Sequence, residues 1–181
     1  MNKPKVKALL SGAMVLGLTA SLTAVSGLAG SGSGTVYAAS TAISQANAKQ
    51  MAAVYAQIQA ENAAKVVALV NEERKNAGLK PLVVHTNLSR MAKDKAIDMY
   101  KNGYFSHTSP KHGSPFDMMD AYNITYRYAG ENIAKGQKTP AEVVSAWMDS
   151  PGHKANILNP KYTLIGVGYY NGHWVQEFIG K

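Results

Sequence analysis

The sequence predicts an α+β fold in which helices come first and an antiparallel sheet is built mainly from the C-terminal part of the chain. Apolar residues recur at helical spacing up to about residue 150, and β-rich runs replace them after residue 161. Two such runs are separated by Asn171-Gly172, the strongest short-range signal for a β-hairpin. A length of 181 residues suits one domain with a core of its own.

The first predicted helix follows from a long stretch without helix breakers. No glycine or proline occurs between residues 40 and 77. Residues 62–77 are predicted to be helical, with Gly78 as the C-terminal cap and Pro81 just beyond it. The preceding Ala- and Gln-rich residues 39–61 form either a helical lead-in or a loose linker.

Two further helices are marked by their ends. Residues 88–102 carry an apolar face, with Asn87 as the predicted N-cap and Gly103 at the end. A shorter helix is predicted over residues 114–122, where Pro115 occupies the first turn.

The fourth predicted helix and the strands complete the domain. Residues 139–142 read Thr-Pro-Ala-Glu, which combines a capping box with proline at the first helical position. Pro151-Gly152 is expected to end this helix. Strands are predicted near residues 126–133, 162–170 and 173–179.

The N-terminus predicts an export signal. Three lysines lie within the first seven residues, followed by an apolar stretch from Ala8 to about Leu28. Val36 and Ala38 suit the −3 and −1 positions of a cleavage site, so residues 1–38 are predicted to be a signal peptide. Cleavage would lower the formal net charge from +8 to +5. The alternative is a retained membrane anchor, because the stretch is just long enough to span a bilayer; cleavage would leave no stable transmembrane segment.

The absence of cysteine excludes structural disulfides, thiolate zinc sites and cysteine nucleophiles. An exported chain without cysteine fits a Gram-positive bacterium better than an animal secretory pathway. The remaining positive charge is compatible with an anionic cell-wall polymer or membrane surface, and equally with a simple contribution to solubility. The lysines are scattered, so no nucleic-acid partner is expected.

Three residues are candidates for chemistry. His107 follows the second predicted helix, Glu131 lies in Gly130-Glu131-Asn132, and His153 follows the fourth helix. All three lie at ends of predicted elements, where loops place functional groups on a rigid frame. Two imidazoles and a carboxylate can transfer protons or hold a divalent metal. No HExxH, GxSxG or phosphate-binding glycine-rich motif is present.

Six segments in order carry a resemblance to a known family. They are Val70-Asn71-Glu72-Glu73-Arg74, Phe105-Ser106-His107, Gly130-Glu131-Asn132-Ile133-Ala134, Trp147 through His153 to Leu158, Ile165-Gly166-Val167-Gly168 and Trp174-Val175-Gln176-Glu177-Phe178. Residues 62–181 thereby resemble a CAP domain, the superfamily of cysteine-rich secretory proteins, antigen 5 and pathogenesis-related proteins, in its bacterial secreted SCP-like branch.

The resemblance implies an α-β-α sandwich, with a central antiparallel sheet between helical layers. It also implies a cleft with a tetrad of two histidines and two glutamates. By motif, His107, Glu131 and His153 match three members of the tetrad. Ser150 stands where the second glutamate would be, three positions after Trp147. The tetrad of the family is therefore incomplete in this sequence.

Three functions remain open at this point. The first is an extracellular or wall-associated binding module, whose cleft of His107, Glu131, His153, Ser150, Asn132 and Asn156 holds a small ligand, a lipid or a wall component. The second is a hydrolase of peptide or wall substrates, in which His107 and His153 hold Zn²⁺. The third is a scaffold, in which the same residues form a buried network. The binding module is the preferred hypothesis; it needs no cofactor and no catalysis.

Overall fold

The computed structural model describes residues 33–181, with side chains from residue 41. The predicted signal peptide lies largely outside the described residues, and its predicted cleavage site after Ala38 falls in the first turns of a helix. Within residues 33–181, no helix has the length and apolar character needed to cross a bilayer. The elements in order are α1 (Ser33–Asn76), β1 (Val83–Val84), α2 (Thr86–Lys101), α3 (Pro115–Ala121), β2 (Tyr128–Lys135), α4 (Pro140–Asp149), α5 (Pro151–Ile157), β3 (Leu164–Tyr170) and β4 (His173–Gly180).

The four strands form one mixed sheet in the order β1-β3-β4-β2. β4 pairs antiparallel with both β2 and β3, as the hairpin signal predicts. Asn171 and Gly172 have φ angles of 42° and 78°, which is the left-handed backbone that a two-residue type I′ turn requires. The two-residue β1 was not predicted, and it pairs parallel with β3 through Val83 and Val84.

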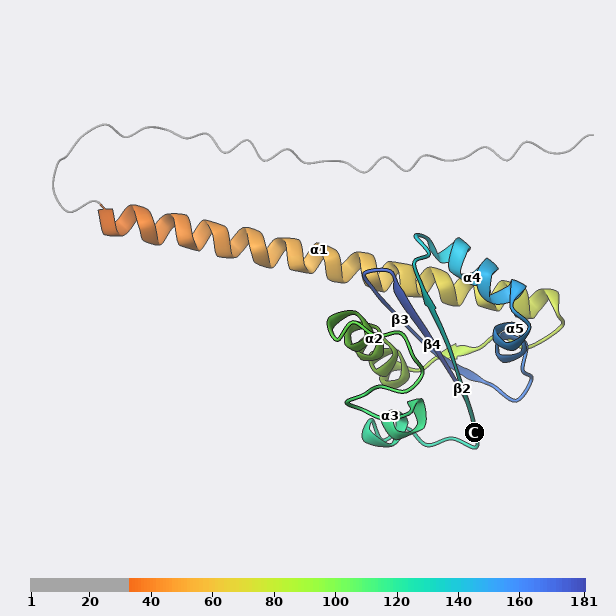
Figure 1. Cartoon of the computed structure of the whole chain (residues 1–181). Coiled ribbons are helices and arrows are strands. Elements are labelled where there is room, and N and C mark those ends of the chain that lie inside the picture. The colour runs from red at the N-terminus through yellow and green to blue at the C-terminus, as the bar shows by residue number, and fades with distance from the viewer. Residues whose placement is uncertain (1–32) are drawn as a thin grey trace, which may run out of the picture. The chain divides into compact units, whose positions relative to one another are not determined.

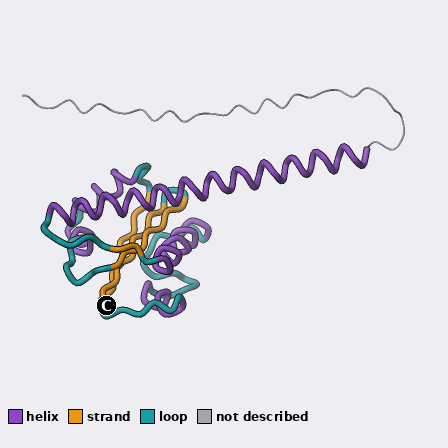
Figure 2. Tube along the Cα trace, turned by 180° about the vertical axis from the view of Figure 1, so that it is seen from behind, coloured by secondary structure: helices purple, strands orange, loops and turns teal. Residues whose placement is uncertain are grey.

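Helices cover both faces of the sheet, which confirms the α-β-α sandwich. Figure 1 shows α2 and α3 on one side of the strands and α1, α4 and α5 on the other, and Figure 2 shows the same layers from behind. Trp147, Trp174 and Phe178 anchor the core between the sheet and the layer of α1, α4 and α5. On the opposite face, Met91 and Ile179 belong to the core beneath α2 and α3.

α2 lies unusually close to β3 because two glycines leave room for it. A Cβ atom on Gly166 would collide with the backbone of Leu88, and one on Gly168 with the backbone of Ala92. The close packing at these glycines is made against a helix, because a residue without a side chain lets another backbone approach closely.

α1 is one continuous helix, so residues 39–61 take the helical alternative. The helix ends in a Schellman arrangement, in which Leu79 N donates to Arg74 O at 2.9 Å and Gly78 N donates to Lys75 O at 3.0 Å. Gly78 has a φ of 74°, which favours glycine over other residues at this position.

One predicted helix boundary was wrong, and one helix was not predicted. The N-cap of α2 is His85 rather than Asn87, and its Nδ1 accepts from Leu88 N at 3.2 Å. His85 N pairs with Ile165 O at 2.9 Å, so strand pairing fixes the residue after which the helix can begin. Pro151-Gly152 ends α4 but also opens α5, because proline suits the first turn of a helix.

Candidate functional site

α2 brings two charged residues to the face of the helix that packs on the sheet. Lys95 has no exposed surface and Asp98 is 8% exposed. They are three positions apart on a helix, so both side chains lie on the same face. Buried charges are costly unless they are paired, and both residues are bound to the loop that follows α2.

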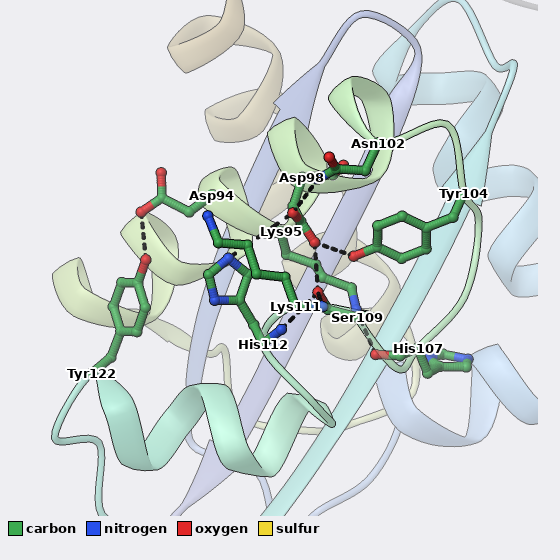
Figure 3. Close-up of polar contacts among 10 residues, drawn as sticks. All are labelled: Asp94, Lys95, Asp98, Asn102, Tyr104, His107, Ser109, Lys111, His112 and Tyr122. Atoms are coloured by element: carbon green, nitrogen blue, oxygen red, sulfur yellow. Dashed lines mark hydrogen bonds and ion pairs between the residues drawn. The ribbon is translucent and has the colours of Figure 1, made fainter.

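Asp98 anchors that loop. Its carboxylate accepts from Asn102 Nδ2 at 2.6 Å, from Ser109 Oγ at 2.7 Å and from the Tyr104 hydroxyl, and His112 Nε2 lies 4.0 Å away (Figure 3). Burial would raise the pKa of Asp98, but the hydrogen bonds from Tyr104 and Ser109 outweigh it and hold the pKa below its usual value. Burial, followed by the bond to Asp98, raises the pKa of Tyr104 to about 12.

Lys95 fixes the backbone of the first candidate residue. Its Nζ donates to His107 O at 2.5 Å, so α2 directly holds the peptide that carries the imidazole (Figure 3). Burial lowers the pKa of Lys95, and the negative charges of Glu131, Glu177 and Asp98 act in the opposite direction. A buried ammonium group thus lies among three carboxyl groups.

Glu131 and His107 form a hydrogen-bonded pair across β2 and the loop. His107 Nδ1 lies 2.6 Å from Glu131 Oε1. The side chain of His107 is 54% exposed, whereas that of Glu131 is 3% exposed. The bond to Glu131 raises the pKa of His107 against the opposing effect of burial. A buried carboxylate therefore orients an imidazole that solvent can reach.

A second carboxyl group lies beside the first. Glu177 of β4 is directly opposite Glu131 in the strand pairing and has no exposed surface. Burial, then the negative charge of Glu131, raises the pKa of Glu177 well above its ordinary value. Within the described part of the chain, Glu131 Oε2 and both carboxyl oxygens of Glu177 have no hydrogen-bond partner. Burial without a donor, beside another carboxyl group, disfavours the charged form of Glu177.

His153 comes from the other layer of the sandwich. It lies in the first turn of α5 and is half-buried. Burial lowers its pKa, and the positive charge of His107 lowers it further. His107 is therefore the more basic of the two imidazoles.

The two asparagines of the predicted cleft hold α5 to the sheet. Asn132 Nδ2 donates to His153 O at 3.1 Å and to Gln176 Oε1 at 3.0 Å, and Asn156 Nδ2 donates to Asn132 Oδ1 at 2.9 Å. Asn132 has no exposed surface, so its side chain cannot touch a ligand. The prediction that Asn132 contacts ligand in the cleft is therefore corrected. Asn132 instead binds the backbone carbonyl of His153 and so positions that residue. Ser150 is half-buried at the junction of α4 and α5 and its side chain makes no capping bond there.

A family model described as the cysteine-rich secretory protein family, CAP, matches residues 67–178. The chain belongs to this family. It does so without a single cysteine, so the CAP fold here is held by packing and hydrogen bonds.

Similar proteins are bacterial. The uncharacterized protein YkwD of Bacillus subtilis is 59% identical over 119 residues, which are 65% of this chain and 46% of that protein. An extracellular protein containing an SCP domain from Bacillus anthracis superposes with a TM-score of 0.69 at 33% identity, over 70% of this chain and 43% of that one. An outer surface protein of Borrelia burgdorferi gives a TM-score of 0.62 at 25% identity, over 67% of this chain and 93% of that one. The chain thus spans less than half the length of the Bacillus proteins it matches.

The CAP domain does not offer a complete zinc site among its described residues. No three His, Cys, Asp or Glu side chains within residues 33–181 are arranged to hold a metal ion. His107 and His153 would be two protein ligands, whereas catalytic zinc sites use three. The nearby carboxylate of Glu131 already binds His107 Nδ1. Two imidazoles and a carboxylate that already binds His107 therefore fit a zinc ion poorly.

Three site residues escaped the sequence analysis: Lys95, Asp98 and Glu177. A signal for each was present in the sequence, because each is a charged residue on an otherwise apolar face. Lys95 and Asp98 share the face of α2 that carries Met91 and Met99. Alternation places Glu177 on the same side of β4 as Val175 and Ile179.

Proposed function

We propose that this CAP domain is an extracellular binding module of a bacterium. His107 and His153 would contact a small ligand, a lipid or a cell-wall component, with Glu131 as the group that orients His107. One observation carries the proposal: an exposed imidazole is held at 2.6 Å by a buried carboxylate. Such an arrangement fixes the direction of the outward-facing Nε2 before any ligand arrives, which reduces the entropic cost of binding.

The charges of the site favour a ligand that presents an anionic or hydrogen-bond-accepting group. The raised pKa of His107 favours its protonated form, in which Nε2 is a donor. Lys95 adds a positive charge beneath the loop, where it is as buried as the carboxyl groups of Glu131 and Glu177. The group of the cluster that solvent reaches is therefore the imidazole of His107, which suits the phosphate or carboxylate groups of wall polymers and lipids.

An extracellular location is supported by two independent features. The N-terminal sequence has the lysines, apolar stretch and small-residue exit of an export signal. Among the similar structures, one is described as an extracellular protein and another as an outer surface protein. Attachment to a Gram-positive cell wall is part of the same proposal.

Isothermal titration with soluble peptidoglycan fragments tests the site. His107→Ala is expected to weaken binding by about tenfold or more, because it removes both the outward donor and the partner of Glu131. His112→Ala is the matched control, since His112 is a half-exposed histidine of the same loop outside the pair. Equal affinities of wild type and His107→Ala would contradict the proposal.

The scaffold alternative has an observation of its own in its favour. His153 O is held by Asn132, which also bonds Gln176 in the sheet. His153→Ala keeps this carbonyl and removes only the imidazole, whereas Asn132→Ala removes both bonds. If the network is only structural, Asn132→Ala lowers the melting temperature and His153→Ala leaves binding intact. If His153 contacts ligand, His153→Ala weakens binding while the melting temperature changes little. The metal-assisted hydrolase is a different hypothesis from the binding module. Titration with Zn²⁺ at neutral pH distinguishes the two, because His107 and His153 must both be neutral to bind the ion and only the hydrolase requires that they bind it.

A further inference from the structure

β3 has an outer edge that its neighbour covers only at one end. β1 pairs with Leu164 and Ile165 and then stops at Val84. Ile165 O accepts from His85 N at 2.9 Å, so the peptide groups of Ile165 face this edge. In the part of the chain that the structure describes, no strand pairs with β3 beyond Ile165 on this side.

The open part of the edge carries four backbone hydrogen-bonding groups. Successive residues of a strand direct their peptide groups to opposite edges, so Val167 and Tyr169 face outward like Ile165. The alternate residues Gly166 and Gly168 face β4, with which β3 pairs along its whole length. The N–H and C=O groups of Val167 and Tyr169 therefore face the outer edge and pair with no described strand, although Val167 as a whole is only 5% exposed.

This edge forms the floor of a groove between α1 and α2. One hollow of about 400 Å³ has Val167, Gly168 and Tyr169 in its lining, and a second of about 510 Å³ reaches Tyr170 and Asn171. The two adjoin, because Gln59 of α1 and Lys93 of α2 line both. We call them together the strand-edge groove. Figure 1 shows its two walls, α1 and α2, on opposite sides of the sheet.

The wall formed by α1 leaves space for side chains of a guest. It presents Ala60, Ala63 and Ala64 to the groove, and a methyl group occupies little volume. A strand added to a sheet lies about 4.8 Å from its neighbour and projects alternate side chains to either face. The small side chains of α1 leave room for those side chains of an added strand that point toward this wall.

The wall formed by α2 is positively charged. Arg90 and Lys93 line the groove, and among the described lining residues there is no carboxylate. The guanidinium of Arg90 lies 5.1 Å from the centre of the ring of Tyr122, which is outside the lining, so the charge that this wall offers to a guest is that of Lys93. Among the described residues, Lys93 takes part in no ion pair.

We propose that the strand-edge groove binds an extended acidic peptide, which adds a strand to the sheet along Val167 and Tyr169. Main-chain hydrogen bonds to β3 supply affinity, apolar side chains fill the space beside Ala64, and carboxylates pair with Lys93. A lipid chain would leave the four backbone groups without partners, whereas a peptide satisfies them. The proposal does not depend on the function of His107, which belongs to a loop beside β2 at the opposite edge of the sheet.

The probe is a blocked peptide of alternating glutamate and valine, about six residues long, enough to run past the open edge at about 3.3 Å per residue. Binding to the full chain is followed by NMR. We expect saturable shifts of the Val167 and Tyr169 amides and about tenfold slower hydrogen exchange at both. A peptide N-methylated at alternate residues cannot pair, and we expect it to give neither change.

Paired variants locate the site. Ala64→Trp fills the groove from an exposed position of α1 and should abolish binding, whereas Ala68→Trp, exposed on the same helix but outside the groove lining, should leave it unchanged. Lys93→Glu should weaken binding of the acidic peptide about tenfold and strengthen binding of the analogue in which lysine replaces glutamate. Lys101→Glu, on the exposed last turn of α2, is the matched charge control, and His107→Ala should bind the peptide as wild type does.

Several outcomes would overturn the proposal. They are an absence of saturable binding, equal binding by Ala64→Trp, and equal binding of the N-methylated peptide. Shifts at Val167 and Tyr169 that grow with protein concentration in the absence of peptide would instead assign the groove to a second copy of the chain. Displacement of the peptide by laurate, with larger shifts for laurate alone, would assign it to a lipid.

Discussion

Glu177 shows how one residue can alter the chemistry of the whole site. It is fully buried, opposite Glu131 on the neighbouring strand, and close to the ammonium group of Lys95. Ser150 removes the second glutamate of the family tetrad, yet the sheet supplies a second carboxyl group from a different element. Burial beside Glu131 raises the pKa of Glu177, so this second carboxyl group favours its neutral form.

Replacing Glu177 should change how stability depends on pH. The raised pKa of Glu177 means that the folded state keeps a proton that the unfolded state releases above its ordinary pKa of 4.5. The contribution of Glu177 is therefore intact below that pH and is lost as pH rises toward the folded pKa. Glu177→Gln does not titrate. The free energy of unfolding of Glu177→Gln minus that of wild type should therefore increase by up to about 1.4 kcal/mol for each pH unit above pH 4.5.

Urea denaturation at a series of pH values measures this difference. Glu72→Gln, on the exposed surface of α1, serves as the control and should follow wild type. A constant difference between Glu177→Gln and wild type at all pH values would show that Glu177 is ionised in the folded protein.

At the level of elements, α1 is attached to the rest of the domain through its last turn. Arg74 is 2% exposed. Its guanidinium donates to Lys80 O at 2.9 Å, Ile157 O at 2.8 Å, Asn159 O at 2.9 Å and Tyr162 O at 3.3 Å. Lys80 lies in the loop after α1, whereas the other three carbonyls belong to the end of α5 and to the loop after it, so one side chain joins the two helices. The planar fork of arginine is suited to several carbonyls at once.

Arg74→Ala should lower the free energy of unfolding by about 3 kcal/mol, because charge-assisted bonds are lost and buried carbonyls keep no donor. Arg74→Lys should recover part of the loss, since an ammonium group keeps the charge but not the fork. Lys75→Ala, at the neighbouring exposed position, is the control. Chemical denaturation of the three variants checks the order, and a loss for Arg74→Ala no larger than for Lys75→Ala would show that the Arg74 bonds contribute little.

Other elements show which boundaries local sequence can predict. Ser114 caps α3 and its partner Asp117 completes the capping box, so the helix start follows from four consecutive residues. In α4, Thr139 Oγ1 accepts from Glu142 N at 3.2 Å, but Glu142 reaches Lys138 N rather than Thr139 N. β1 could not be predicted from two valines, because only pairing with a strand some eighty residues later defines it.

At the level of the molecule, the long α1 divides into a part that carries the core and a part that does not. Val66 and Val70 are fully buried, whereas Ile43, Met51 and Ile58 are exposed. Core packing from α1 therefore begins near residue 63, close to the start of the predicted CAP domain.

Truncation tests this division. A chain that begins at residue 53 should melt within about 2 °C of a chain that begins at residue 41, because residues 41–52 are all exposed. A chain that begins at residue 68 loses buried Val66 and should be less stable by more than about 2 kcal/mol. Thermal unfolding followed by circular dichroism compares them, and equal melting temperatures would show that α1 contributes no core packing before residue 68.

From the sequence alone came the order of helices and strands apart from β1 and α5, the hairpin at Asn171-Gly172, the family, and His107, Glu131 and His153 as candidates. These follow from caps, turns and motifs, which act over a few neighbouring residues. Tertiary structure alone revealed that Glu131 lies opposite Glu177, that Lys95 holds His107, and that the outer edge of β3 is open. Strand register and helix placement depend on contacts between residues far apart in the chain, and no local pattern specifies which distant side chains will meet.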